Sequence, residues 1–63
     1  MLRLMFERKK KKLTQIQLAE VVGVSRITIN KWETGKSTPS VEMLLKLSKY
    51  FNVTTDYLLE KEK

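Results

Sequence analysis

Apolar residues recur at helical spacing along most of the chain, and capping residues separate one run from the next. The clearest run follows Thr14, which forms with Gln17 the T-x-x-Q pattern of a capping box. Its apolar positions have the spacing i, i+1 and i+4 and are Leu18, Ala19 and Val22. Gly23 permits the left-handed backbone that closes a helix at its C-terminus. The pattern therefore predicts a helix between Thr14 and Gly23.

A second helix is predicted between Ser25, a favourable N-cap, and Gly35. One face, expected to be buried, has the spacing i, i+3 and i+4 and carries Ile29, Trp32 and Glu33. The opposite face is polar except for one isoleucine and carries Arg26, Ile27, Asn30, Lys31 and Thr34. A helix that is buried on one side only leaves its other side for a partner. Because a short turn joins the two helices, residues 14–34 are predicted to form a helix-turn-helix.

Three further helices are predicted outside this motif. The first covers residues 2–11, with Leu4 on one side and, on another, Leu2, Met5 and Phe6. The second begins after the cap Ser40, and its inward positions are Met43 or Leu44, Leu47 and Phe51. The third is short and begins after a cap at Thr54 or Thr55, with the inward positions Leu58 and Leu59.

Five short helices and no strong strand candidate place the chain in the all-α class. Its 63 residues are enough for one small domain, so we expect a compact five-helix bundle over 1–63, frayed at 60–63. Cysteine and histidine are absent, which removes disulfides, thiol nucleophiles, imidazole bases and the usual zinc ligands. We therefore predict no catalytic residue and no metal site. The apolar runs are too short to span a membrane, and a cytoplasmic protein is expected.

The positive charge is concentrated at the N-terminus. The net charge is +6, and residues 1–12 contribute +5 of it, from six basic residues against Glu7. A basic balance favours a polyanionic partner, either nucleic acid or an anionic membrane surface. Much of this charge lies in the run 9–12, and such a run is most often the solvated end of a helix. The run therefore supports nucleic-acid binding only weakly.

The motifs taken together resemble the Cro/C1-type helix-turn-helix family of phage repressors and bacterial regulators, over residues 13–59. The matching motifs are Leu13-Thr14-Gln15, Leu18-Ala19-Glu20, Val22-Gly23-Val24-Ser25-Arg26, Ile29, Trp32-Glu33, Gly35-Lys36, Pro39-Ser40, Leu44-Leu45-Lys46-Leu47-Ser48, Val53 and Asp56-Tyr57-Leu58-Leu59. The resemblance implies a lambda-repressor-like bundle that binds operator DNA as a homodimer, with no enzyme activity and no cofactor.

The outward face of the helix over 25–34 supplies the candidate base-reading residues. Arg26 suits bidentate bonding to guanine, although a phosphate contact or a solvated side chain is the alternative. Ile27 suits a thymine methyl group, unless it packs on its own domain. Asn30 can pair with adenine, and Lys31 can reach guanine or, more often, phosphate. Thr28 lies at the border of this face and either touches a base or bonds back to its helix.

A second set of residues is expected to hold the DNA backbone. Gln15 begins the first helix of the motif, where free amides and the positive dipole end favour a phosphate, and the family carries a glutamine there that anchors to the backbone. Thr14 and Ser25 lie at helix starts and serve first as caps. The loop after the second helix either binds the sugar–phosphate backbone of one DNA strand or is an ordinary polar loop. Its candidate backbone contacts are Lys36, Ser37 and Thr38.

The resemblance also assigns some residues to structure and assembly. Arg8 and Glu33 are expected to pair between the first and third helices, or else both lie at the surface. Family members commonly dimerise through their last helices, which makes Tyr50, Val53 and Tyr57 candidates for a homodimer patch. The alternative for these three is ordinary core and rim.

The preferred interpretation is a sequence-specific double-stranded DNA-binding regulator, a repressor that places the helix over 25–34 in the major groove of a palindromic operator. The alternative is an antitoxin or another protein-interaction module on the same fold. The sequence has no extended acidic arm that could wrap a toxin, which argues against this alternative. A membrane-surface helix at 1–12 has too short an apolar face to hold alone. No small-molecule ligand is evident.

Overall fold

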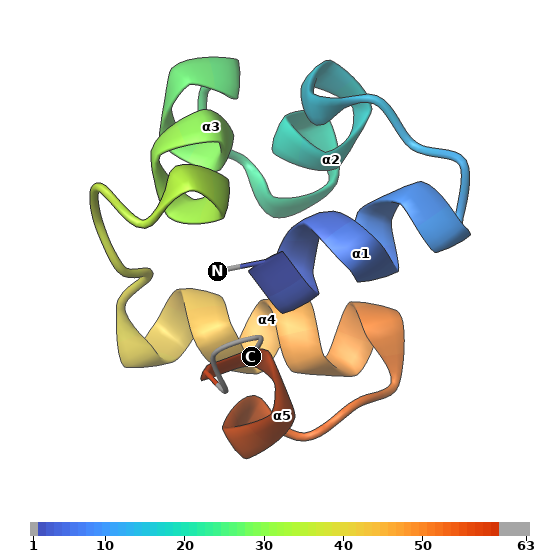
Figure 1. Cartoon of the computed structure of the whole chain (residues 1–63), viewed down its shortest axis with the longest axis vertical. Helices are drawn as coiled ribbons and strands as arrows, with labels where there is room; N and C mark the ends of the chain where they lie inside the picture. Colours follow the sequence, from blue (N-terminus) through green and yellow to red (C-terminus); the bar gives the residue numbers. More distant parts are fainter. Residues whose placement is uncertain (1, 60–63) are drawn as a thin grey trace.

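The computed structural model describes residues 2–59, without the side chain of Leu2, and these residues form five helices (Figure 1). The helices are α1 (Leu2–Lys10), α2 (Gln15–Val22), α3 (Arg26–Thr34), α4 (Val41–Phe51) and α5 (Thr55–Leu59). Within 2–59 no residue belongs to a strand, and the all-α class is confirmed. The fraying expected at 60–63 lies outside the described residues.

The predicted caps are present at the start of each of the last four helices. The Thr14 hydroxyl accepts from the backbone N–H of Gln17, whose side-chain oxygen accepts in return from the backbone N–H of Thr14. The hydroxyls of Ser25 and Ser40 accept from the backbone N–H three residues later in the same way. Of the two candidates before α5, Thr54 is the cap, since its hydroxyl accepts from the backbone N–H of Tyr57. These bonds satisfy amides that have no partner within the helix.

Four helices end on a residue in the left-handed backbone conformation. Gly23 and Gly35 close α2 and α3 as predicted, with φ of 79° and 80°. Asn52 closes α4 with φ 57°, and Lys12 follows α1 with φ 59°. At the end of α1, the backbone N–H of Lys12 donates to the carbonyl of Lys9 and that of Leu13 to the carbonyl of Arg8, the Schellman pattern. The sequence analysis missed this left-handed lysine, because the run 9–12 carries no glycine to mark it.

The core takes one fully buried side chain from each helix. These side chains are Leu4, Leu18, Ile29, Leu47 and Leu58, from α1 to α5 in order. Ala19, Val22, Trp32 and Phe51 surround them in the same cluster. Burial of each large apolar side chain contributes about 1.5–3 kcal/mol, so the cluster is the main force that holds the five short helices together. Each helix is anchored to the others rather than stable by itself.

One expected core position, Leu59, is wrong, and the structure defines the buried face of α1, which the apolar pattern had left open. Phe6 is 55% exposed, while Leu4 on another side of α1 is fully buried. The buried face of α1 continues from Leu4 to the charged residues Glu7 and Arg8, so the apolar pattern did not reveal it. Leu59 is 47% exposed, whereas Leu58 is the fully buried side chain of the short α5.

Candidate nucleic-acid interface

The helix-turn-helix is built by a tight turn and a close helix crossing between α2 and α3. The backbone N–H groups of Gly23 and Val24 both donate to the carbonyl of Ala19, at 2.8 and 3.0 Å. Ala19 is 4% exposed, and Ile29 of α3 is fully buried in the same core cluster. A small side chain at position 19 lets the two helices approach, and Ile29 holds α3 by one face. α3 is therefore placed rigidly with its other face directed outward.

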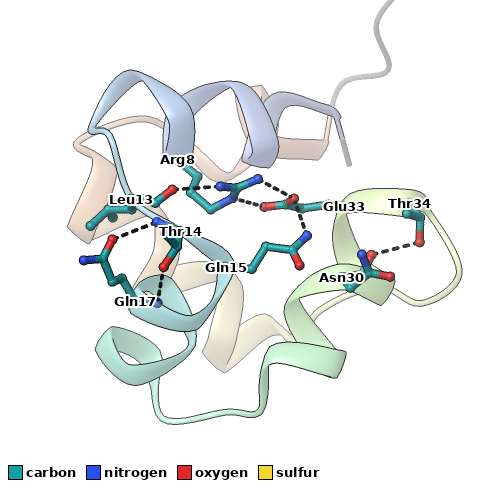
Figure 2. Close-up of polar contacts among 8 residues, drawn as sticks. All are labelled: Arg8, Leu13, Thr14, Gln15, Gln17, Asn30, Glu33 and Thr34. Atoms are coloured by element: carbon teal, nitrogen blue, oxygen red, sulfur yellow. Dashed lines mark hydrogen bonds and ion pairs between the residues drawn. The ribbon is translucent and has the colours of Figure 1, made fainter.

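The outward face of α3 brings together most of the candidate base-reading residues. Arg26, Ile27 and Lys31 are exposed, and Ile27 leaves 59% of its surface uncovered. Asn30 is half-buried, and its backbone carbonyl accepts from the Thr34 hydroxyl at 2.8 Å (Figure 2). Ile27 thus lies among charged and polar side chains on this face, and it is one of several large apolar residues exposed within residues 2–59.

Thr28 and Ser25 are occupied at the start of α3. The Ser25 hydroxyl accepts from the backbone N–H of Thr28 at 3.2 Å, and the two hydroxyl oxygens lie 3.0 Å apart. Thr28 is half-buried, so it lies at the edge of the outward face. Both hydroxyls serve the helix start in this structure, and any contact to a partner would be additional to that role.

A polar cluster beneath this face links α1, α2 and α3, and Figure 2 shows its side chains converging on Glu33. The Arg8 guanidinium donates through Nε to Glu33 Oε2 at 2.6 Å and through Nη2 to Glu33 Oε1 at 3.0 Å. Its third nitrogen, Nη1, donates to the carbonyl of Leu13 at 2.7 Å. Both partners are buried, at 8% and 3% exposure. The expected pair is therefore present, with the two-pronged geometry that a guanidinium and a carboxylate favour.

Gln15 joins the same cluster, which the sequence analysis did not foresee. Its Nε2 donates to Glu33 Oε1 at 3.0 Å, so the first residue of α2 is tied to the buried side of α3. An amide nitrogen carries two hydrogens, and this bond uses one of them. The other remains for a partner at the N-terminus of α2. The only clue in the sequence was that Glu33 falls on the inward face of α3.

The remaining backbone candidates lie at the surface of the motif. Thr14 is exposed and occupied in its capping box. In the loop after α3, Lys36 and Thr38 are exposed and Ser37 is half-buried. The backbone N–H groups of Lys36 and Ser37 both donate to the carbonyl of Lys31, so the loop starts in a defined conformation.

The three candidates for a homodimer patch have different positions. Tyr50 is 36% exposed, and its ring meets the Phe51 ring edge-on at 5.1 Å. Val53 and Tyr57 are half-buried and pack against the core. The Tyr57 hydroxyl donates to Glu7 Oε2 at 2.9 Å, and the Arg3 guanidinium lies 4.7 Å from the centre of the Tyr57 ring. Of the three, Tyr50 has the most surface to offer a partner.

Two features are absent from residues 2–59. No helix in this range is long and apolar enough to cross a membrane. No group of three or more acidic, histidine or cysteine side chains in the range is arranged to hold a metal ion.

The chain belongs to the helix-turn-helix family, which matches residues 4–58. It is 56% identical over 52 residues to the HTH-type transcriptional activator BcrR of Enterococcus faecalis, covering 82% of this chain and 26% of that protein. It is 43% identical over 58 residues to Repressor protein C2 of Salmonella phage P22, covering 92% of this chain and 27% of that protein. The chain thus spans about a quarter of the length of these two relatives.

The fold also matches a solved protein–DNA complex. The P22 c2 repressor, in its crystal structure with the synthetic operator 9T, superimposes with a TM-score of 0.88 at 41% sequence identity. The match covers 97% of this chain and 92% of that chain. All five helices are therefore those of a helix-turn-helix domain.

Proposed function

We propose that this domain binds double-stranded DNA sequence-specifically and regulates transcription, with α3 in the major groove of an operator. The observation that carries the proposal is the division of α3 into a buried face and an exposed face that combines Arg26, Ile27 and Lys31. The major groove admits one such helix. The P22 c2 repressor, whose fold this chain shares, was solved bound to an operator.

Sequence is read from the outward face of α3. Arg26, in the first turn, donates two hydrogen bonds to guanine O6 and N7. Ile27 covers a thymine methyl group, which explains an isoleucine with more than half its surface exposed. Asn30 pairs with adenine, Lys31 reaches guanine or phosphate, and Thr28 touches the edge of the site.

The register on the duplex is set by contacts to the DNA backbone. The second amide hydrogen of Gln15 and the free N–H groups of the first turn of α2 bind one phosphate. Thr14 and Ser25 lie beside these helix starts. The loop after α3 holds the neighbouring strand through Lys36, Ser37 and Thr38. Such contacts fix orientation and carry no sequence information.

The domain acts as a homodimer on a palindromic operator, with half-site centres about 34–36 Å apart, one turn of the double helix. Tyr50 supplies the exposed aromatic part of the dimer surface, and Val53 and Tyr57 support it from the core. Binding of this kind represses transcription by blocking the polymerase, which requires nothing beyond occupancy of the site.

Selection of duplexes from a random-sequence pool by the chain tests the proposal. We expect enrichment of a palindrome. Arg26→Ala should then lose about 1–3 kcal/mol of discrimination at one base pair of each half-site, measured by gel shift with single-base operator variants. Lys46→Ala on α4 is the charge-matched control and should leave that preference unchanged. A uniform loss on all sequences would make Arg26 a phosphate contact, and no enrichment at all would favour the protein-interaction alternative.

A further inference from the structure

The lysine run 9–12 divides into two pairs according to what its side chains contact. Lys10 Nζ lies 3.8 Å from Glu7 Oε2 and 5.7 Å from the centre of the Phe6 ring. Lys11 Nζ lies 5.1 Å from the centre of the Tyr50 ring on α4. The side chains of Lys9 and Lys12 are exposed and make no ion pair, hydrogen bond or ring contact within residues 2–59. Half of the run is thus held by the domain, and half is free for a partner.

Lys12 occupies a backbone conformation that its residue type disfavours. The left-handed region brings a Cβ too close to the following carbonyl oxygen, so glycine enters it freely, asparagine and aspartate enter it occasionally, and other residues do so rarely. The three other left-handed helix ends of this chain follow that preference, with Gly23, Gly35 and Asn52. The Schellman bonds at this position use backbone atoms alone, so the lysine side chain contributes to none of them. A disfavoured backbone conformation of this kind motivates the hypothesis that the side chain has a function.

The position of the free pair relates it to the helix-turn-helix. Lys12 precedes the cap of α2 by two residues. The Arg8 guanidinium fixes the turn between α1 and α2 by its hydrogen bond to the Leu13 carbonyl. Successive residues of a helix advance by about 100°. Lys9 therefore lies on the flank of α1 next to Arg8, which reaches α3, whereas Lys10 lies on the Glu7 flank, which reaches Tyr57 on α5. Lys9 thus lies on the flank of α1 that leads to α3, and Lys12 lies beyond α1 in the short link to α2.

We propose that Lys9 and Lys12 bind phosphates of the DNA strand that passes the N-terminus of α2, outside the base pairs that α3 reads. This inference rests on the proposed function and extends the site to α1. Each ammonium binds phosphate oxygens as a point charge and releases condensed counterions from the duplex. The contacts are independent of base sequence, so they raise affinity for every duplex by the same factor.

Two charge-matched double variants test the proposal. Lys9→Gln with Lys12→Asn removes the free pair, and asparagine keeps a residue that tolerates the left-handed backbone. Lys10→Gln with Lys11→Gln removes the same charge from the held pair. Affinity is measured between about 50 and 200 mM salt on the selected operator and on a mixed-sequence duplex. The slope of log affinity against log salt should fall by about 1.8 per subunit for the first variant, at about 0.9 per lost contact, and by much less for the second.

The outcomes separate this inference from the proposed function. Equal changes of slope in both variants, or no change in either, overturn the phosphate contacts. A parent chain that binds both duplexes equally overturns sequence-specific reading, while the mixed-sequence duplex still decides the lysine comparison. A parent chain that binds neither duplex at low salt overturns both. Circular dichroism of each variant checks that the helices are retained.

Discussion

Glu7 and Arg8 are neighbours in sequence and both are buried, yet they hold different halves of the molecule. Arg8 reaches Glu33 on α3, and through Glu33 the first residue of α2. Glu7 faces the other way and accepts a hydrogen bond from Tyr57 on α5. One turn of α1, which lies between the helix-turn-helix half (α2 and α3) and the α4–α5 half of the bundle in Figure 1, thus contacts both halves through two unlike polar contacts.

The two contacts differ in what is left behind when a partner is lost. The Arg8–Glu33 contact joins a buried guanidinium to a buried carboxylate by two hydrogen bonds. The Glu7 contact joins a buried carboxylate to a neutral phenol, with the exposed ammonium of Lys10 at 3.8 Å nearby. A buried charge without its partner costs far more than a lost neutral donor. The helix-turn-helix half should therefore be the more sensitive of the two to the loss of a partner.

The largest effect is expected when Arg8 is replaced by methionine. The Glu33 carboxylate then stays buried without its two hydrogen bonds from the guanidinium, and the free energy of unfolding should fall by about 3–5 kcal/mol in urea denaturation. Glu33→Leu added to Arg8→Met removes the buried carboxylate and should restore much of the loss. A single variant that loses under about 1 kcal/mol, or a double variant that loses more than the single one, would contradict this account of the pair.

A smaller effect is expected on the other side of α1. Tyr57→Phe removes the donor to the Glu7 carboxylate and leaves the ring in place, so stability should fall by about 1.5–3 kcal/mol, the range for a hydrogen bond to a charged group. Tyr50→Phe removes a hydroxyl that makes no hydrogen bond within residues 2–59 and should change stability by less than about 0.5 kcal/mol. If the two tyrosine variants behave alike, the Glu7 contact contributes nothing to the bundle.

The smallest change in stability, and the only stabilising one of the three, is expected at Lys12 in the turn between α1 and α2. Lys12→Gly relieves the left-handed backbone and should raise the free energy of unfolding by about 0.5–1 kcal/mol, less than the full strain because glycine also has more freedom in the unfolded chain. Lys12→Ala keeps a Cβ at the same φ and should bring no gain. A thermal or urea melt in which glycine and alanine behave alike would show that position 12 stores no strain.

The same substitution also separates stability from binding. Lys12→Gly should stabilise the domain and still weaken its binding to a mixed-sequence duplex, since the ammonium is gone. A variant that is both more stable and binds as well as the parent would leave the left-handed lysine without a function.

Local features were predictable because their causes lie within a few residues. A hydroxyl and an amide three residues apart make each cap, and a glycine ends α2 and α3. The two faces of α3 follow from the helical period, so Arg26, Ile27 and Lys31 were placed outward from the sequence alone. The Arg8–Glu33 pair was expected only through the family resemblance, and the inward position of Glu33 was the single supporting sign in the chain itself.

Tertiary structure decided where polar groups are buried. Leu4 rather than Phe6 enters the core because Glu7 and Arg8 lie on the same face of α1 as Leu4. These two charged side chains can be buried only where other residues form hydrogen bonds or ion pairs with them. Those partners lie 25 residues away for Arg8 and 50 for Glu7, and Gln15 meets Glu33 across 18. The sequence by itself determined five helices, their caps and the outward face of α3, since each depends on neighbours along the chain. The folded chain alone brings together the residues that form the Arg8–Glu33–Gln15 hydrogen bonds, which orient that face. It also determines which lysines of the run 9–12 make no ion pair, hydrogen bond or ring contact within residues 2–59.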